Sequence, residues 1–580
     1  MRRSASAAML RFAAGVLILA ATLLQPARAY ETVFRNSFDF APNDRSPLGA
    51  NLDAVKDDST SADFVDAMKQ SREWITLRQS GGWDTNEEAC LDLDAHGYPR
   101  TLQPRSDVAG CATAQYDAVA TLFLYGSYQG HRPATGSTYV VTWDGDGTIS
   151  YHYGVRKSAA SSAHRDVLEV TTTDNGWAMR FDRINPNDPI RNVHVWMPGY
   201  DEHSGPSQLF HPDFLAFIRK YKVLRFMDWM RTNGPDSGGG STQGDFDARP
   251  QLADVRWTTD KGVPLEIMVE LANRTDTDPW FNMPHLAGDD YMQRFAQKVR
   301  RLLRHDLHVY VEYSNEVWNG GFVQGGWVEQ QGTQDFLDAH GNPRGTPFDR
   351  RMNWHGQRTA QMCELWKAAW GSDADRVTCV LGAQAANAYS QTQAADCPFS
   401  TLQPCSAHGI GAVAIAPYFG GYLGQPSAQA TVRSWTLDTL FTEIEQGGQL
   451  AGGPPGGALA EARHWLAPQR TAADARGLHL ISYEGGQHLV GVFGVENDAA
   501  ITTLFTAANR DARMGDAVTH NLADWRAKGE LFLQFTASGS YGKWGSWGAF
   551  EYVDHTSTPK HQALIDFIAS HPCWWSGCSH

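Results

Sequence analysis

The sequence predicts an α/β fold, a (β/α)8 TIM barrel with an inserted β-sandwich-like region. First, short runs of β-branched and aromatic residues alternate with amphipathic segments over most of the 580 residues, which is typical of a parallel sheet surrounded by helices. Second, two of these runs end at a glutamate, one at Asn315 and Glu316 and the other at Glu484. Third, a stretch with two-residue alternation and Asp-Gly turns interrupts the barrel pattern after its first unit.

The N-terminal residues have the features of a cleavable export signal. Two arginines follow the initiating methionine, residues 13–24 are apolar, and residues 27–29 form a small-x-small cleavage site. We therefore expect residues 1–29 to be a signal peptide, the mature chain to begin at Tyr30, and the protein to be extracellular or periplasmic. No later stretch approaches about 20 uninterrupted apolar residues, so no membrane insertion is predicted.

The composition limits the kinds of partner. The formal net charge is −15, and it becomes more negative when the signal, which is rich in arginine and has no acidic residue, is removed. Such a surface repels nucleic acids, anionic membranes and polyanionic glycans. The chain has 20 tryptophans, which would suit stacking on sugars, although core packing accounts for most of them. A neutral ligand is therefore favoured, and nucleic acid is not expected as a partner.

The eight cysteines indicate disulfides rather than a metal site, because the protein is expected to be exported. Eight cysteines allow about 105 pairings, and only their local spacing favours one of these. The expected pairs are Cys90–Cys111, Cys363–Cys379, Cys397–Cys405 and Cys573–Cys578. Neither a Cys-x-x-Cys nor a His-Glu-x-x-His spacing occurs, so no metal or other cofactor is expected.

The first barrel unit is expected within residues 30–74, with a strand at residues 47–52 and a helix at residues 63–74. Residues 75–200 differ, because they consist of short alternating runs separated by turns such as the Asp-Gly repeat at residues 144–147. This pattern is typical of β-hairpins. We expect residues 75–200 to form a β-rich insertion that either binds carbohydrate or shapes one wall of a cleft.

The barrel pattern resumes and occupies residues 201–580. Helices are expected at residues 212–221, 289–304 and 352–370. The second to eighth strands are expected at residues 222–229, at 264–271, in the run before Glu316, at 376–382, at 412–418, in the run before Glu484, and at 531–536. Alternation of this kind predicts a parallel sheet, and eight such units match a closed barrel.

Two carboxyl groups are expected at the mouth of this barrel, because side chains at the C-terminal ends of the strands face the substrate cleft. Glu316, preceded by Asn315, follows the fourth strand, and Glu484 follows the seventh. In this arrangement the sequence resembles the clan A retaining glycoside hydrolases, without matching an individual family. The resemblance implies that Glu316 is the acid/base, that Glu484 is the nucleophile, and that Asn315 binds the sugar 2-hydroxyl.

Further positions follow the same resemblance. Arg225 resembles the strand-two arginine that supports the nucleophile, and Tyr418 resembles the strand-six tyrosine that donates a hydrogen bond to it. The remaining candidates would line the cleft or its floor: Trp318, His488, and either Trp544 or Trp547. Ion pairing or core packing is the alternative role for these side chains. Many relatives have a histidine after the third strand, whereas residues 271–273 here are Leu-Ala-Asn.

The two carboxyl groups are expected to differ in protonation. Hydrogen bonds from Arg225 and Tyr418 would lower the pKa of Glu484, whereas burial and a neighbouring negative charge would raise the pKa of Glu316. The ends of strands four and seven face each other across a barrel mouth. This predicts a carboxyl separation of about 5–5.5 Å, the value of retaining enzymes.

The expected function is that of a secreted retaining β-glycoside hydrolase whose substrate is a polysaccharide or oligosaccharide. Long loops after strands four, six and eight would form an extended cleft, which favours cutting within a neutral chain. A transglycosidase uses the same residues with a sugar acceptor, so this alternative stays open. The alternative from another class is a non-catalytic carbohydrate-binding or surface protein, which would not need both carboxyl groups with their supporting arginine and tyrosine.

Overall fold

The computed structural model describes residues 46–575, apart from residues 82, 125–132, 173–175, 236–238 and 554–556. The predicted signal peptide, residues 1–29, lies outside these ranges and stays a prediction.

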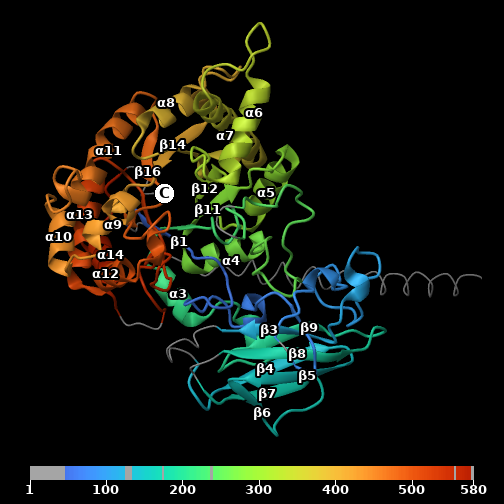
Figure 1. The fold of residues 1–580 in the computed structure, drawn as a ribbon. Helices are drawn as coiled ribbons and strands as arrows, with labels where there is room; N and C mark the ends of the chain where they lie inside the picture. The colour runs from blue at the N-terminus through green and yellow to red at the C-terminus, as the bar shows by residue number, and fades with distance from the viewer. Residues whose placement is uncertain are drawn as a thin grey trace, which may run out of the picture.

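An eight-stranded parallel sheet forms the centre of the structure (Figure 1). Its strands, in the order in which they pair, are β16 (His479–Ser482), β14 (Ile410–Ile415), β13 (Val377–Gly382), β12 (Val309–Tyr313), β11 (Asp278–Met283), β10 (Val223–Arg225), β1 (Leu48–Asn51) and β18 (Phe532–Gln534). Backbone hydrogen bonds join the two ends of this order: Ser482 N–H donates to the Leu531 carbonyl (2.8 Å), and Glu530 N–H to the Leu480 carbonyl (2.9 Å). The sheet therefore closes, and the predicted (β/α)8 barrel is confirmed.

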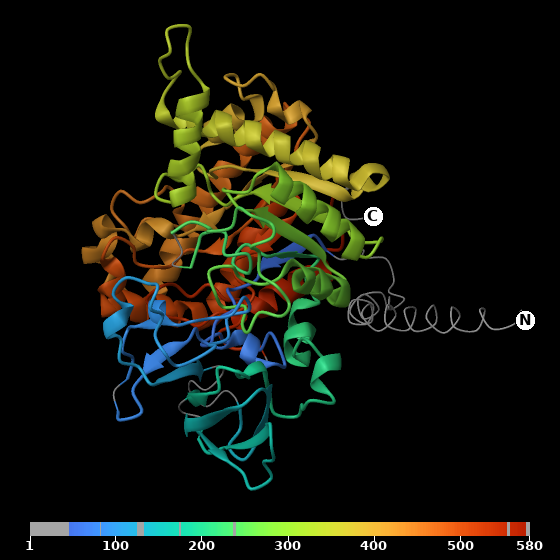
Figure 2. The ribbon, with the colours of Figure 1, turned by 90° about the vertical axis from the view of Figure 1, so that its right-hand side faces the viewer.

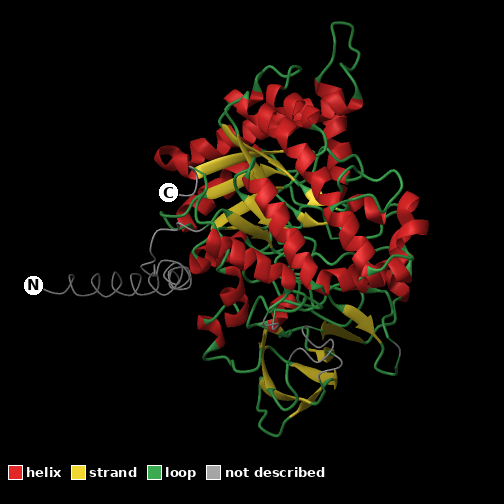
Figure 3. Ribbon diagram, turned by 90° about the vertical axis from the view of Figure 1, so that its left-hand side faces the viewer, coloured by secondary structure: helices red, strands yellow, loops and turns green. Residues whose placement is uncertain are grey.

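Helices surround the barrel, as Figure 3 shows in red around the yellow strands. They are α3 (Pro212–Ile218), α4 (Leu265–Thr275), α5 (Asp289–Leu302), α6 (Val323–Asp335), α7 (Pro347–Trp370), α8 (Ala388–Asp396), α9 (Pro426–Val432), α10 (Leu437–Glu445), α11 (Gly457–Asp474), α12 (Ala499–Arg510), α13 (Ala512–Arg526) and α14 (Pro559–Ser570). In α5, buried Tyr291, Phe295 and Val299 recur every four residues, so one apolar face packs inward. Among the described residues, no helix is long and apolar enough to cross a membrane.

The third strand lies later in the chain than the sequence predicted. Residues 264–271 belong to the start of α4, and the third strand is β11. Every residue from 265 to 272 is buried, and a fully buried run does not distinguish helix from strand by periodicity. Pro279 inside β11 obscured the true strand, because proline donates no hydrogen bond to a sheet. His285 follows the true third strand, β11, after one intervening residue. The expected absence of a histidine after the third strand, which came from residues 271–273, is therefore wrong.

The helix predicted at residues 63–74 is also wrong. Only Ala67–Gln70 is helical, as a single 3-10 turn. Phe64 forms an isolated antiparallel bridge with Phe210, far away in the sequence. Tertiary pairing therefore extends the backbone where the local spacing favoured a helix.

A β-rich region lies beside the barrel, at the bottom of Figures 1 and 2. Its strands are β2 (Ile75–Leu77), β3 (Ala118–Phe123), β4 (Thr138–Asp144), β5 (Gly147–Tyr153), β6 (Val155–Lys157), β7 (Arg165–Val170), β8 (Trp177–Ile184) and β9 (Arg191–Trp196). They form two antiparallel sheets, β2-β3-β8-β5 and β6-β7-β4-β9. The turn at residues 144–147 joins one sheet to the other, so the hairpin predicted there is wrong. That residues 75–200 fold as a distinct domain remains a prediction.

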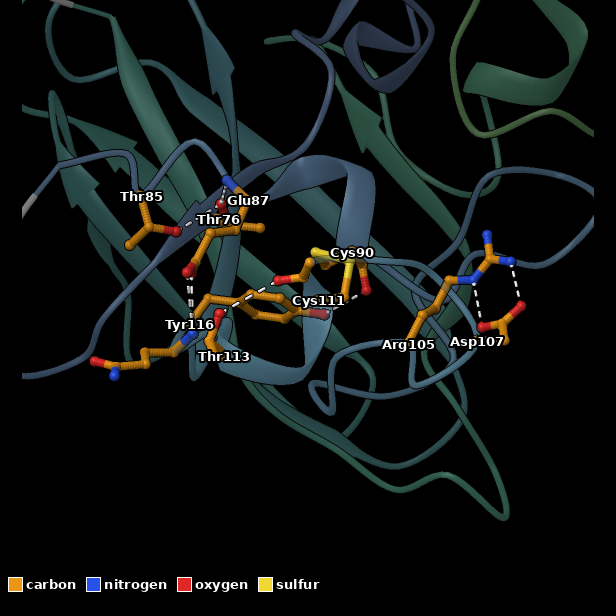
Figure 4. Close-up of a disulfide and its surroundings, with 11 residues drawn as sticks. Thr76, Thr85, Glu87, Cys90, Arg105, Asp107, Cys111, Thr113 and Tyr116 are labelled. Atoms are coloured by element: carbon orange, nitrogen blue, oxygen red, sulfur yellow. Dashed lines mark hydrogen bonds and ion pairs between the residues drawn. A yellow bond between two sulfur atoms is a disulfide. The ribbon is translucent and has the colours of Figure 1, made fainter.

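The described residues contain three of the predicted disulfides: Cys90–Cys111, Cys363–Cys379 and Cys397–Cys405. Figure 4 shows the first, where the Tyr116 hydroxyl donates to the carbonyl of Cys90 at 2.9 Å. The second joins α7 to β13 of the barrel. The fourth predicted pair, Cys573–Cys578, includes a residue outside the described ranges and remains a prediction.

Replacing Cys90 and Cys111 together with alanine should lower the free energy of unfolding of the β-rich region by up to about 3 kcal/mol, because the bond restricts the unfolded chain. Its cysteines are 21 residues apart. The measurement is thermal unfolding combined with the rate of limited proteolysis between the two positions. The matched Cys397 and Cys405 variant, with a separation of 8 residues, should lose less stability. An unchanged proteolysis rate in the first variant would contradict the expectation.

Candidate active site

Arg225, the last residue of β10, is fully buried and contacts residues from three other strands or the turns that follow them. Its Nη1 donates to Glu484 Oε1 (2.7 Å) and Asn51 Oδ1 (3.0 Å). Its Nη2 donates to Glu312 Oε2 (2.8 Å) and Asn315 Oδ1 (2.8 Å). A guanidinium removed from water is tolerated only when its charge and its donors are matched in this way. Arg225 therefore holds the predicted nucleophile and the predicted asparagine in fixed positions.

A second carboxylate, that of Glu312, also pairs with Arg225. The sequence did not indicate a role for this residue. It lies in β12 and is 1% exposed. Its Oε2 also accepts hydrogen bonds from Trp280 Nε1 (3.0 Å) and Asn282 Nδ2 (2.9 Å). Glu312 is therefore enclosed by the barrel interior, where it neutralises Arg225 from the side opposite to Glu484.

Glu484 follows β16 and receives a donor on each carboxyl oxygen. Arg225 Nη1 contacts Oε1, and the Tyr418 hydroxyl donates to Oε2 at 2.9 Å. Burial raises the pKa of Glu484, while Arg225 and Tyr418 oppose this rise. The predicted lowering of this pKa is therefore wrong, because removal from water outweighs the two donors.

Glu316 lies in a turn directly after β12. Ser314 and Glu316 both have positive φ angles, 60° and 45°, an uncommon backbone conformation for residues other than glycine. The Tyr483 hydroxyl donates to Glu316 Oε1 at 2.9 Å. Burial first, and then the negative charge of Glu484, raise the pKa of Glu316 to about 8. Of the two carboxyl groups, only Glu484 touches a guanidinium, so the surroundings favour ionisation of Glu484 before that of Glu316.

Both carboxyl groups line one cavity of about 580 Å³. Four other predicted residues line it with them: Trp318, Tyr418, His488 and Trp547. The Trp547 ring packs edge-on against His488, with ring centroids 5.0 Å apart, and against Tyr418 at 5.9 Å. Trp544 is 70% exposed and outside the lining, so of the two candidates Trp547 fits the expected floor. Arg225 and Asn315 are not among the residues that line this cavity.

The cavity also has lining residues that the sequence did not indicate. Tyr483 directly precedes Glu484. Its position at a strand end next to a predicted catalytic glutamate could have indicated that it lines the cavity. The others carry no recognisable motif: Asn319, Gln384, Ala385, Ala386, Ala416, Gly421, Tyr422, Gln425, Glu461, Trp465 and Phe535. His285 is buried after β11, outside this lining, and burial lowers its pKa to about 4.

No protein-family model matches the chain, and no curated protein matches it. Among solved structures, it is similar to a family 5 xyloglucanase from Paenibacillus pabuli, with 10% identity, coverage of 64% of this chain and 93% of that chain, and a TM-score of 0.34. It is also similar to xylanase 10C from Cellvibrio japonicus, with 8% identity, coverage of 87% and 98%, and a TM-score of 0.34. A third is a GH5 xyloglucan-specific β-1,4-glucanase from a ruminal metagenomic library, with 10% identity, coverage of 61% and 95%, and a TM-score of 0.30. Identities and TM-scores this low do not assign an activity to this chain.

Replacing Arg225 with methionine should lower the free energy of unfolding by about 3–5 kcal/mol, because it leaves Glu312 and Glu484 buried without their cation. The measurement is chemical denaturation. Adding Glu312→Gln to this variant should recover part of the loss. Arg463→Met is the control, because the pair of Arg463 with Asp524 is solvent-exposed and should contribute less than about 1 kcal/mol. Equal losses in the Arg225 and Arg463 variants would refute the proposed dependence on the buried charge.

Proposed function

We propose that this protein is a retaining β-glycoside hydrolase. The observation that carries the proposal is the pair of carboxyl groups in one cavity, of which Glu484 contacts a guanidinium, while burial and the charge of Glu484 raise the pKa of Glu316 to about 8. Retaining hydrolysis requires this combination, since one group must act as an acid and the other as a nucleophile. Structural ion pairs rarely need one protonated and one ionised partner side by side in an open cavity.

In the first step, the Glu484 carboxylate attacks the anomeric carbon of the sugar. Glu316 transfers its proton to the glycosidic oxygen as the bond from that oxygen to the anomeric carbon breaks. The leaving sugar departs as an alcohol, and the other sugar remains as an ester of Glu484. Arg225 and Tyr418 orient the attacking carboxylate, and Asn315, held by Arg225, would bind the 2-hydroxyl.

In the second step, Glu316 acts as a base. Esterification removes the negative charge of Glu484. The electrostatic repulsion that raised the pKa of Glu316 is then lost, and this pKa falls. Water attacks the anomeric carbon and gives a proton to Glu316, and the Glu484 carboxylate is released. Two displacements at one carbon leave its configuration unchanged. This course requires a carboxyl separation of about 5–5.5 Å.

The substrate that we propose is a neutral polysaccharide, cut within its chain by a protein exported through residues 1–29. The acidic net charge of −15 disfavours an anionic chain. A sugar acceptor in place of water would give transglycosylation with the same residues, so this alternative stays open. A non-catalytic carbohydrate-binding role is less well supported, because binding alone does not require the difference in protonation.

Replacing Tyr483 with phenylalanine should move the alkaline limb of the kcat/KM profile to higher pH. The Tyr483 hydroxyl favours the ionised form of Glu316, so its loss raises that pKa above about 8. Activity needs protonated Glu316, so it is present below this pKa and is lost as the pH rises through it. Tyr151→Phe is the matched control, because the Tyr151 hydroxyl donates to Asp166 at 2.9 Å outside the cavity lining. A limb that stays or moves downward in the Tyr483 variant would count against the assignment.

Replacement of the two glutamates should have different consequences. The substrate is first found by screening the mature protein on neutral polysaccharides for new reducing ends. Glu484→Ala should abolish nearly all turnover on every substrate. Glu316→Ala should lose about 10²–10⁴-fold on the polysaccharide, the usual contribution of a general acid, but far less on an aryl glycoside, whose leaving group needs little protonation.

Azide separates the two roles. It should rescue Glu316→Ala with a β-azide product and Glu484→Ala with an α-azide product, as followed by NMR. Glu445→Ala, at a glutamate that pairs with His520 outside the cavity lining, is the control and should behave as the wild type. Full activity in either cavity variant, or an inverted product from the wild type, would disprove the proposed mechanism.

A further inference from the structure

The cavity that contains the two carboxyl groups is lined by segments that follow β12, β13, β14, β16 and β18 and by α11, and none of its lining residues follows β1, β10 or β11. Beyond Glu316 its walls come from the segments that follow β12, β13 and β14, and from α11. Glu461 and Trp465 are four residues apart on α11, so they lie one above the other on the same helix face. Both line the cavity. This wall therefore combines a carboxylate with an indole ring.

Polar side chains on this wall have unused hydrogen-bonding capacity. Among the described residues, the side chains of Glu461, Gln384 and Gln425 make no hydrogen bond or ion pair with another side chain or with the backbone. Glu461 is half-buried, and burial raises its pKa. By contrast, the Tyr418 and Tyr483 hydroxyls are used on the two catalytic carboxyls. Partly buried polar groups without protein partners are suited to hydrogen bonds with a ligand.

The direction of the cavity indicates which part of a substrate it would hold. Asn315, the predicted contact of the 2-hydroxyl, faces the second barrel strand, β10, and the segment that follows it. Its amide donates to Asn233 Oδ1 (3.2 Å), and its oxygen accepts from Arg225 at the end of β10. The transferred sugar therefore belongs on that side. Glu316, which would protonate the departing oxygen, lines the cavity together with Glu461, whereas Asn315 is not part of this lining.

We propose that Glu461, with Trp465 and Trp318, forms the binding site for the neutral sugar on the leaving-group side. The Glu461 carboxylate would accept hydrogen bonds from the hydroxyls of this sugar, and the indole rings would contact its apolar face. Gln384 and Gln425 supply further donors and acceptors. This inference rests on the proposed glycoside hydrolase function. It makes Glu461 a determinant of specificity that takes no part in the bond-breaking step.

The test compares two substrates with the same transferred sugar: the neutral oligosaccharide on which the wild type is most active, and its 4-nitrophenyl glycoside. Glu461→Ala should lose about 10- to 100-fold in kcat/KM on the oligosaccharide, the range expected for hydrogen bonds to a charged group. The loss should appear mainly in KM. It should be at least about ten times smaller on the aryl glycoside, whose leaving group has no sugar hydroxyls. Glu461→Gln, which keeps an acceptor, should retain part of the oligosaccharide activity.

The matched control is Asp474→Asn, which removes a carboxylate from the same helix, where Asp474 pairs with Arg470 outside the cavity. This variant should behave as the wild type on both substrates. Equal losses of Glu461→Ala on the oligosaccharide and the aryl glycoside would overturn the inference, because a general structural defect affects both. A higher kcat/KM of the wild type on the corresponding amino-sugar oligosaccharide would also overturn it, since the carboxylate would then serve a cation.

A binding experiment separates failure of this inference from failure of the proposed function. In the Glu484→Ala background, neutral oligosaccharides of the panel are titrated by calorimetry with and without Glu461→Ala. Weaker binding in the double variant supports the inference even if hydrolysis is absent. Unchanged binding, or no binding of any panel sugar to the Glu484→Ala protein, overturns it. Failure of the proposed function alone would appear as weaker binding in the double variant together with either full activity of Glu484→Ala or no hydrolysis by the wild type.

Discussion

The buried cation of Arg225 is the interaction on which the barrel mouth depends. Its guanidinium binds Glu312 on one side and Glu484 on the other, and it lies 5.1 Å from the ring centre of Tyr483 and 5.6 Å from that of Trp280. A planar group with donors in fixed directions matches two carboxylates at once, which lysine would not do. Because these partners come from separate strands, one side chain sets the relative positions of the groups around it.

The electrostatic consequence is an unequal pair of carboxyl groups. Glu484 is buried and Glu316 is half-buried, but only the former has a cation in contact. Tyrosine hydroxyls donate to each, from Tyr418 to Glu484 and from Tyr483 to Glu316. These hydrogen bonds fix the orientation of both carboxyls, while the charge of Arg225 decides which of them ionises first. The difference arises from the surroundings, since both residues are glutamates.

The site divides its tasks between the barrel and the segments around it. Arg225, Glu312 and Glu484 belong to strands or follow them directly, where the sheet hydrogen bonds limit movement. The more distant cavity wall comes from connecting segments and from α11. In barrels of this type the connections vary more freely than the strands. Under the proposed function, the chemistry would thus be tied to the rigid part of the fold, and the choice of sugar would depend on the outer part.

Much of the fold and the two central glutamates could be predicted from the sequence. Runs of β-branched residues mark most of the strands, and Glu316 and Glu484 each follow such a run. The prediction failed at residues 264–271, because a segment buried on all sides has no periodicity that separates helix from strand. It also failed at residues 63–74, where pairing of Phe64 with a distant segment overrides the local preference. Both errors come from burial or pairing imposed by the rest of the chain.

The sequence by itself determined the barrel pattern, the three described disulfide pairs and the positions of the carboxyl groups, because each is expressed in local spacing. Only the tertiary structure decided that Tyr483 donates to Glu316, 167 residues away, and that Glu312 neutralises Arg225, 87 residues away. It also distinguished Trp547 in the cavity from exposed Trp544. The tertiary structure also decided that the pKa of Glu484 is raised, because burial outweighs the hydrogen bonds from Arg225 and Tyr418. Burial and contact between distant residues decide these properties, and neither is written in the spacing of residues along the chain.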